Sequence, residues 1–357
     1  MADWEAPGTF DPRPPTTAAR LRDDSLVYGR LWTSDPAGRL IPDLAVAVPT
    51  RSGGVLSVRL RSGLRWSDGS PLTPADAAAS LREQGLAAEA VDSRTLRVTA
   101  DSRAVAAAFI APAQPDGRVA SGPFRLASAD ATALRFERNP HYHGHPPYLA
   151  TVVELISASH DAMIESAQAG EVDYLPHLGP ADLATSFGPL RLDVTRSERE
   201  EVLVPQGLGI STAAALSAAT DRQALADQQF GGRAAATGPP PQALLASFLL
   251  PAGGVQVSLQ TVCDDPLRLA EAGQLATEWQ PLGVRATVTC APIARLTAAP
   301  TAPRVALYSV LAGQAPPGAI PLLRWPGVRA ISPALHGFTA NDTVGTDLWD
   351  VADWWLQ

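Results

Sequence analysis

The stretch that decides the fold is LRSGLRWSDGSPLTPADAAASL, residues 60–81. In it Thr73 is followed by proline and, three residues on, by Asp76. A capping hydroxyl, a proline at the first helical position and a carboxylate in the first turn are typical of a helix start. Residues 67–71 are rich in turn formers, and the alternation of apolar and polar residues over 55–60 predicts a half-buried strand. The sequence therefore predicts a strand, a turn and a capped helix, in that order.

The composition is that of a globular chain long enough for two lobes. Its 357 residues are 46% hydrophobic and 18% charged, with a formal net charge of −8. There is no run of Lys or Arg to provide the positive surface that nucleic acids or anionic membranes attract. The opening MADWEAPGTF lacks the features of an export signal, and no apolar run is long enough to span a bilayer. We therefore predict a cytoplasmic protein without nucleic-acid binding or membrane insertion, or an extracytoplasmic one if a signal peptide has been removed.

Hydrophobic periodicity further along the chain predicts βαβ units. Residues 255–263 and 284–290 alternate as strands do, and apolar residues recur between them at helical spacing over 267–279. A right-handed crossover makes such strands parallel members of one sheet. A second unit of this kind is predicted within 151–175. These patterns indicate an α/β protein.

The segment 60–81 resembles the signature of the family 5 solute-binding proteins, which are the peptide, dipeptide and nickel receptors of ABC importers. The family's L-R-x-G start, its D-G-x-P turn and its T-x-x-D helix start are all present here in order. Other segments resemble the family pattern, are collinear with it and span nearly the whole chain. They are 7–12 (PGTFDP), 27–31 (VYGRL, where the family has V-Y-E-G-L), 40–44 (LIPDL), 121–126 (SGPFRL), 137–144 (ERNPHYHG), 167–173 (AQAGEVD), 214–225 and 338–356.

The resemblance implies an α/β fold of the two-lobed, type II periplasmic-binding-protein kind, with a hinge and a ligand-enclosing cleft between the lobes. It implies a main lobe made of residues 1–45, 119–236 and 323–357. A reduced small subdomain, residues 46–118, is expected as an insertion in the main lobe. Residues 237–322 are expected to form a trimmed second lobe.

Two departures from the family pattern bear on function. The chain is much shorter than its relatives although both ends of the pattern are present, so we do not expect an oligopeptide cavity. The segment 307–317, LYSVLAGQAPP, has no aspartate where dipeptide receptors carry one that pairs with the peptide's amino terminus. The lack of both a signal and this anchor favours a fold that has been retained inside the cell for another purpose.

The chemistry-bearing residues are predicted from the same resemblance. No phosphate-binding loop or nucleophile elbow is present, so any reaction is expected to need no cofactor. A glutamate cluster is expected to approach the cleft, and a carboxylate walled by aromatic rings has a raised pKa that suits proton transfer near neutral pH. For any one glutamate the alternative is a solvated turn, and for any one aromatic ring it is core packing. The predicted catalytic residues are Glu198, Glu200 and Glu201, and the predicted ligand-binding residues are Tyr28, Trp32, Tyr308 and Trp325.

Three alternating histidines, His141, His143 and His145, form the one metal-like pattern of the sequence. By resemblance they fall on a corner outside the cleft. We therefore predict surface histidines and no functional metal.

Three functions remain open. The sequence favours a cytosolic biosynthetic enzyme that condenses or cyclises a small aromatic metabolite bearing an amine or an acid, for example by a Pictet–Spengler-type ring closure. The first alternative is the substrate-binding protein of an ABC importer for a small peptide-like solute, with an ABC permease as its partner. The second is a non-catalytic protein that binds a metabolite. All three interpretations imply a small-molecule ligand.

Overall fold

The structure is a computed structural model, and the chain in it divides into two compact units. The first unit comprises residues 1–178, 186–193 and 328–357, and the second comprises 179–185 and 194–327. The structure describes residues 1–3, 10–12, 18–49, 54–230, 234–251, 253–262, 266–291, 293–297, 300, 302–311, 315–341 and 347–357.

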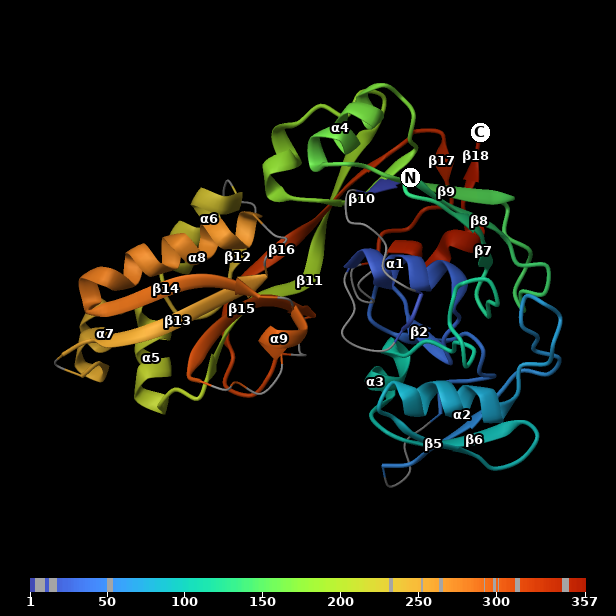
Figure 1. Cartoon of the computed structure of the whole chain (residues 1–357), viewed down its shortest axis with the longest axis horizontal. Helices are drawn as coiled ribbons and strands as arrows, with labels where there is room; N and C mark the ends of the chain where they lie inside the picture. Colours follow the sequence, from blue (N-terminus) through green and yellow to red (C-terminus); the bar gives the residue numbers. More distant parts are fainter. Residues whose placement is uncertain are drawn as a thin grey trace. The chain divides into compact units, whose positions relative to one another are not determined.

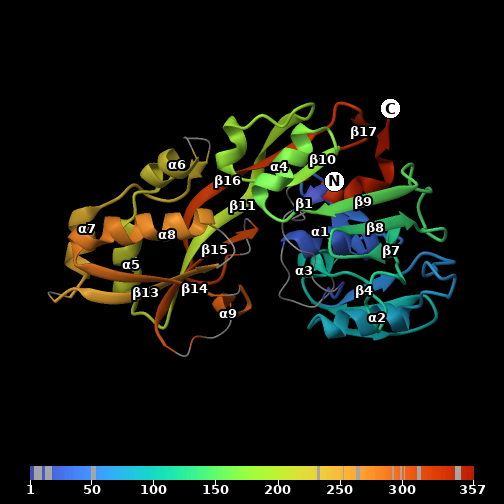
Figure 2. The ribbon, with the colours of Figure 1, turned by 45° about the horizontal axis from the view of Figure 1, so that its top comes forward.

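The first unit is built on small sheets, of which the largest has the strand order β1-β9-β8-β7. Figures 1 and 2 show its three long strands side by side in green. Strands β7, β8 and β9 are antiparallel neighbours, and β1 joins the edge of β9 in parallel. The strands of this sheet are β1 (Ala2–Asp3), β7 (Phe124–Ala129), β8 (Ala133–Arg138) and β9 (Thr151–Ile156).

The predicted strand, turn and capped helix are confirmed in a second sheet of the first unit. Strand β4 (Leu56–Arg59) pairs with β6 (Thr95–Thr99), β6 pairs with β5 (Ala87–Ala90), and helix α2 (Pro74–Glu83) packs on this sheet (Figure 1). Thr73 accepts a hydrogen bond from the Asp76 backbone N–H at 3.3 Å, and Asp76 accepts one from the Thr73 N–H at 2.8 Å. This reciprocal pair is a capping box, and it begins the helix where the sequence predicts.

Short elements complete the first unit. They are α1 (Ala18–Val27), β2 (Trp32–Ser34), β3 (Leu40–Pro42), α3 (Ser102–Ala107), α4 (His160–Gln168), β10 (Tyr174–Leu178), β17 (Leu335–His336), the 3₁₀ helix η3 (Asp347–Asp353) and β18 (Trp355–Leu356).

The second βαβ unit, predicted within 151–175, is not formed. Strand β9 lies in the main sheet, where both of its edges are taken by β8 and β1. Strand β10 instead pairs antiparallel with the end of β16 (Ile320–Ile331), through Tyr174 opposite Ile331. The helical segment is correct, but the two strands belong to different sheets.

The second unit contains the predicted parallel βαβ unit. Strands β13 (Val255–Val262) and β14 (Val284–Ala291) are parallel from Val255 opposite Val284, and α8 (Pro266–Trp279) connects them. Figure 1 shows α8 running along these two strands. The sheet that begins with β10 and β16 continues in the order β11 (Arg191–Gln206), β15 (Arg304–Leu311), β13 and β14, and β12 (Ala235–Ala236) pairs with β16. The remaining elements are η1 (Pro180–Ala184), α5 (Ile210–Ala219), α6 (Arg222–Phe230), α7 (Ala243–Leu249), η2 (Gln280–Leu282) and α9 (Ile293–Thr297).

The units divide the chain differently from the predicted lobes at three places, residues 179–185, 194–236 and 323–327. Residues 194–236 were predicted to lie in the main lobe, but they belong to the second unit. The reason is pairing and packing: β11 pairs with β15, and Leu216 and Leu225 are fully buried in one core with Trp279. Residues 328–357 share the first unit with the N-terminus.

Two further features concern the environment of the protein. In the described part of the chain, no helix is long and apolar enough to cross a membrane.

Cys290, near the end of β14, is disulfide-bonded. Cys263, the other cysteine of the sequence, lies outside the described residues.

Candidate functional site

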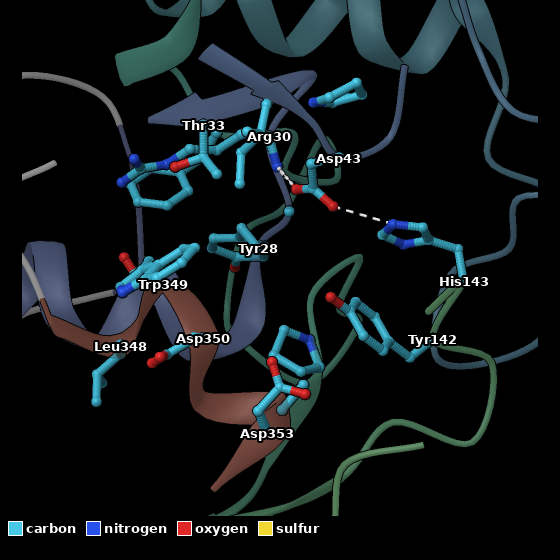
Figure 3. A pocket seen from close by; sticks show the side chains of 17 residues that line it. Tyr28, Arg30, Thr33, Asp43, Tyr142, His143, Leu348, Trp349, Asp350 and Asp353 are labelled. Atoms are coloured by element: carbon cyan, nitrogen blue, oxygen red, sulfur yellow. Dashed lines mark hydrogen bonds and ion pairs between the residues drawn. The ribbon is translucent and has the colours of Figure 1, made fainter. Parts of the chain in front are cut away.

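A pocket with a cavity volume of about 220 Å³ lies within the first unit (Figure 3). It collects polar and aromatic side chains from the segment after α1, the loop after β3, the corner at 139–144 and η3. Those that bear on its chemistry are Tyr28, Arg30, Thr33, Asp43, Phe109, Tyr142, His143, Trp349, Asp350 and Asp353.

Close backbone packing positions the segment that links α1 to β2. A Cβ atom on Gly122 would lie 2.9 Å from the backbone nitrogen of Tyr28 and from the carbonyl carbon of Val27. Glycine is therefore needed here, because any larger residue would push the two segments apart. The Ser121 hydroxyl accepts a hydrogen bond from the Gly29 N–H at 2.9 Å and fixes the same segment.

Asp43 organises one wall of the pocket. Its carboxylate accepts a hydrogen bond from the backbone N–H of Arg30 at 2.7 Å, and its other oxygen lies 3.0 Å from Nε2 of His143 (Figure 3). One carboxylate thus links the segment before β2 to the corner at 139–144.

Arg30 provides a buried positive charge. Its side chain lies over the ring of Phe109, 4.3 Å from the ring centroid, and the residue is only 6% exposed. Within the described ranges, its Nη2 has no hydrogen-bond partner. Burial lowers the pKa of Arg30 to about 10, and the nearby charges of Asp43 and Asp24 oppose this effect.

Asp350, on η3, is the buried carboxylate of the opposite wall. It accepts a hydrogen bond from the indole N–H of Trp354 at 2.8 Å. Burial raises its pKa to about 7, and the hydrogen bond from Trp354 partly offsets that rise. The pocket therefore presents a cation, carboxylates and aromatic surface to a small polar solute.

The predicted aromatic walls are dispersed. Tyr28 lines the pocket, but its hydroxyl donates to the carbonyl of Phe10 and accepts from the Gly117 N–H. Trp32 is fully buried in the core of the small sheet. Tyr308 is buried in the second unit, and the side chain of Trp325 lies outside the described residues.

The predicted glutamates belong to β11 in the second unit. Glu201 is fully buried, and its Oε1 lies 2.9 Å from Nε of Arg268 on α8. Its neighbour Glu200 is half-buried, because successive residues of a strand face opposite sides. The side chain of Glu198 is not among those that the structure describes. Contact of these glutamates with a ligand stays a prediction.

The three histidines lie in three environments. His141 is exposed and packs against Gly69, His143 pairs with Asp43, and Nε2 of His145 lies 2.7 Å from Asp353. Over the residues that the structure describes, no group of three or more His, Cys, Asp or Glu side chains could hold a metal ion. The expectation of no functional metal stays a prediction.

Sequence reasoning missed the polar groups of the pocket. Asp350 is more than 300 residues from Asp43 in the sequence, so no local pattern joins them. Arg30 did leave a signal, since it stands where the V-Y-E-G-L pattern has glycine. A charged residue in place of a glycine of the family pattern indicates a position at which the function has changed.

Comparison with known proteins identifies the family. The model of the bacterial extracellular solute-binding proteins, family 5 Middle, matches residues 82–278, which is more than half of the chain. The chain is also 26% identical over 253 residues to Protein XP55 of Streptomyces lividans. That match covers 58% of this chain and 46% of XP55, so it spans less than half the length of this relative.

Solved structures agree on the fold. The oligopeptide-binding protein AppA of Bacillus subtilis, in complex with a nonapeptide, is 14% identical with a TM-score of 0.81. AgaA from A. tumefaciens, in complex with agropinic acid, is 14% identical with a TM-score of 0.85. Each comparison covers 100% of this chain and 98% of the other. The two-lobed, α/β, periplasmic-binding-protein-like fold predicted from the sequence is confirmed.

The comparisons overturn one prediction. The interpretation as a cofactor-free condensing or cyclising enzyme is wrong, because the relatives are proteins that bind solutes and do not convert them. The extracellular family likewise gives no support to the predicted cytoplasmic location. The chain belongs to the bacterial extracellular solute-binding proteins of family 5.

Proposed function

We propose that this protein is the substrate-binding component of an ABC importer and that it binds a small peptide-like solute. The observation that carries the proposal is the full-length match to solute-binding proteins, together with the family match over residues 82–278. Its partner is then an ABC permease. The cleft between lobes, which the resemblance implies, stays a prediction.

The pocket in the first unit supports the proposal that the solute is small and charged. A cavity of about 220 Å³ suits one or two amino-acid residues better than a long peptide. It presents the guanidinium of Arg30 and the carboxylate of Asp350, which are complementary to the two charged ends of a short peptide.

The cysteine chemistry supports an extracytoplasmic location. Disulfides persist in oxidising compartments and are rare in the reducing cytosol. Cys290 is disulfide-bonded, and the family is described as extracellular. We propose this location in place of the cytoplasmic one.

Thermal unfolding in the presence of defined solutes tests the proposed function. The panel consists of dipeptides, tripeptides, the nonapeptide class that AppA binds and agropinic acid. We expect a short peptide to raise the melting temperature, because a ligand at a hundred times its Kd adds about 2.7 kcal/mol to the free energy of unfolding. The matched control is the N-acetylated carboxamide of each peptide, which lacks both charges. If no member of the panel shifts the melting temperature, the proposal is wrong.

A further inference from the structure

We infer that Arg30 is the anchor of an anion site in the first-unit pocket and that it binds the carboxylate of the solute. The assignment of this carboxylate to a transported solute rests on the proposed function, but the anion site itself rests on the geometry of the pocket. The group bound at this site is the carboxylate of a small organic solute, such as the carboxyl end of a short peptide.

The first argument is the state of the Arg30 guanidinium. It is 6% exposed, and neither an ion pair nor a hydrogen bond to its side chain occurs among the described residues. A buried charge without a partner is costly, and folded proteins normally pair it. Phe109 covers one face of the guanidinium, and Arg30 lines the pocket, so a ligand in the pocket meets the N–H edge rather than that face.

The second argument concerns the carboxylates around the pocket, each of which has a partner other than this guanidinium. Asp43 accepts from the Arg30 backbone N–H and pairs with His143. Asp350 accepts from Trp354, and Asp353 pairs with His145. Asp24, whose charge also acts on Arg30, lies 3.9 Å from the Arg20 guanidinium. The Arg30 guanidinium is therefore left for a carboxylate that comes from outside the chain.

The third argument is chemical complementarity. A guanidinium presents two parallel N–H donors that match the two oxygens of a carboxylate, and such charge-assisted pairs are stronger than neutral hydrogen bonds. Trp349 and Tyr142 line the same pocket and offer apolar surface to the body of the ligand (Figure 3). Aromatic walls with one fixed charge are typical of a site for a small organic anion.

The test compares matched carboxylates and carboxamides on the full chain. Acetate, benzoate and phenylacetate, each paired with its carboxamide, are titrated at constant ionic strength and binding is measured by calorimetry. The variants are Arg30→Met, which removes the charge, and Arg30→Lys, which keeps the charge but loses the planar fork. Arg103→Met is the control, because Arg103 is an exposed arginine outside the pocket.

We expect at least one carboxylate to bind and its carboxamide to bind at least about tenfold more weakly. The affinity of Arg30→Met for that carboxylate should be lower than that of the unchanged protein by a similar factor. The affinity of Arg30→Lys should lie between those of Arg30→Met and the unchanged protein. Arg103→Met should bind the carboxylate as tightly as the unchanged protein does. Arg30→Met is expected to fold, because methionine keeps an unbranched apolar stem against Phe109 and the change breaks no ion pair among the described residues. If it does not fold, equal affinity of Arg30→Lys and the unchanged protein overturns the inference.

The inference is also overturned if no carboxylate binds, if the carboxamides bind equally, or if Arg30→Met binds as the unchanged protein does. The proposed function fails separately. If a short peptide binds equally to the unchanged protein and to Arg30→Met, the anion site is wrong and the proposed function stands. If carboxylates bind through Arg30 but no peptide binds, the anion site is supported and the proposed function is wrong.

Discussion

Asp350 and Glu201 show at the scale of single residues how burial determines what a carboxylate does. Both are acidic residues with little or no exposure. Asp350 accepts a neutral indole N–H, whereas Glu201 faces the guanidinium of Arg268. The first is therefore expected to titrate near neutral pH, and the second to act as half of an ion pair.

Asp350 should make the stability of the protein fall as the pH rises. Its pKa in the folded protein is about 7, above the ordinary value of 3.8. The folded state therefore holds a proton that the unfolded chain has released, and this stabilisation is present below about pH 4 and lost as the pH approaches 7. The free energy of unfolding should fall by up to about 1.4 kcal/mol per pH unit in this window.

The variant Asp350→Asn isolates this effect, because asparagine keeps an oxygen that can accept from Trp354. Asp24, whose pKa burial also raises to about 7, contributes equally to both proteins and cancels in the difference. Urea unfolding of both proteins from pH 4 to pH 8 should show the variant gaining relative stability with pH. Parallel stability curves would contradict this assignment.

Glu201→Ala should destabilise the protein by about 3 kcal/mol, because it leaves the largely buried Arg268 without this partner. The matched control is Glu200→Ala on the other face of the same strand, which should cost less than about 1 kcal/mol. Equal losses in urea unfolding would show that the pair with Arg268 is not what matters.

At the scale of elements, local chemistry predicts those structures that neighbours in sequence determine. Thr73 and Asp76 begin α2 as predicted, and the 255–290 pattern gives parallel strands and their helix. The segment 151–175 shows the limit. Its helix α4 is local and was predictable, but the partner of β10 is β16, about 150 residues away. Pairing over such distances leaves no periodic signal in a single sequence.

Removal of the cap of α2 should have a measurable cost. Thr73→Ala loses the hydroxyl that accepts from Asp76 N–H and should lower the free energy of unfolding by about 1 kcal/mol. Thr73→Ser keeps the hydroxyl and should cost only a few tenths of that amount. A serine variant as unstable as the alanine variant would mean that the methyl group, not the cap, is important.

At the scale of the whole molecule, collinear motifs predicted the two-lobed fold, whereas the departures from the family pattern misled on function. The absent aspartate in 307–317 favoured an enzyme, yet the loss of one anchor is compatible with a different solute. The residues that line the pocket come from positions 25 to 353, and only Tyr28 among them was predicted to bind a ligand. Its geometry depends on how distant segments fold together, which no motif specifies.

The disulfide of Cys290 leads to a prediction for the intact protein. Oxidised protein, denatured in guanidinium, should contain no thiol that reacts with a thiol reagent, whereas reduction should release both cysteines of the sequence. Reduction should also lower the free energy of unfolding by about 2 to 4 kcal/mol. Reactive thiols in the oxidised protein would contradict the disulfide and remove one support for an extracytoplasmic location.

The central claim is that this protein binds a solute and returns it unchanged. The most direct test is calorimetric titration with the peptide that most raises the melting temperature, followed by release of the ligand and its mass spectrometry. The account predicts binding of one peptide per chain and full recovery of that peptide with its original mass, even after long incubation. No saturable binding, or release of a chemically altered product, would contradict it.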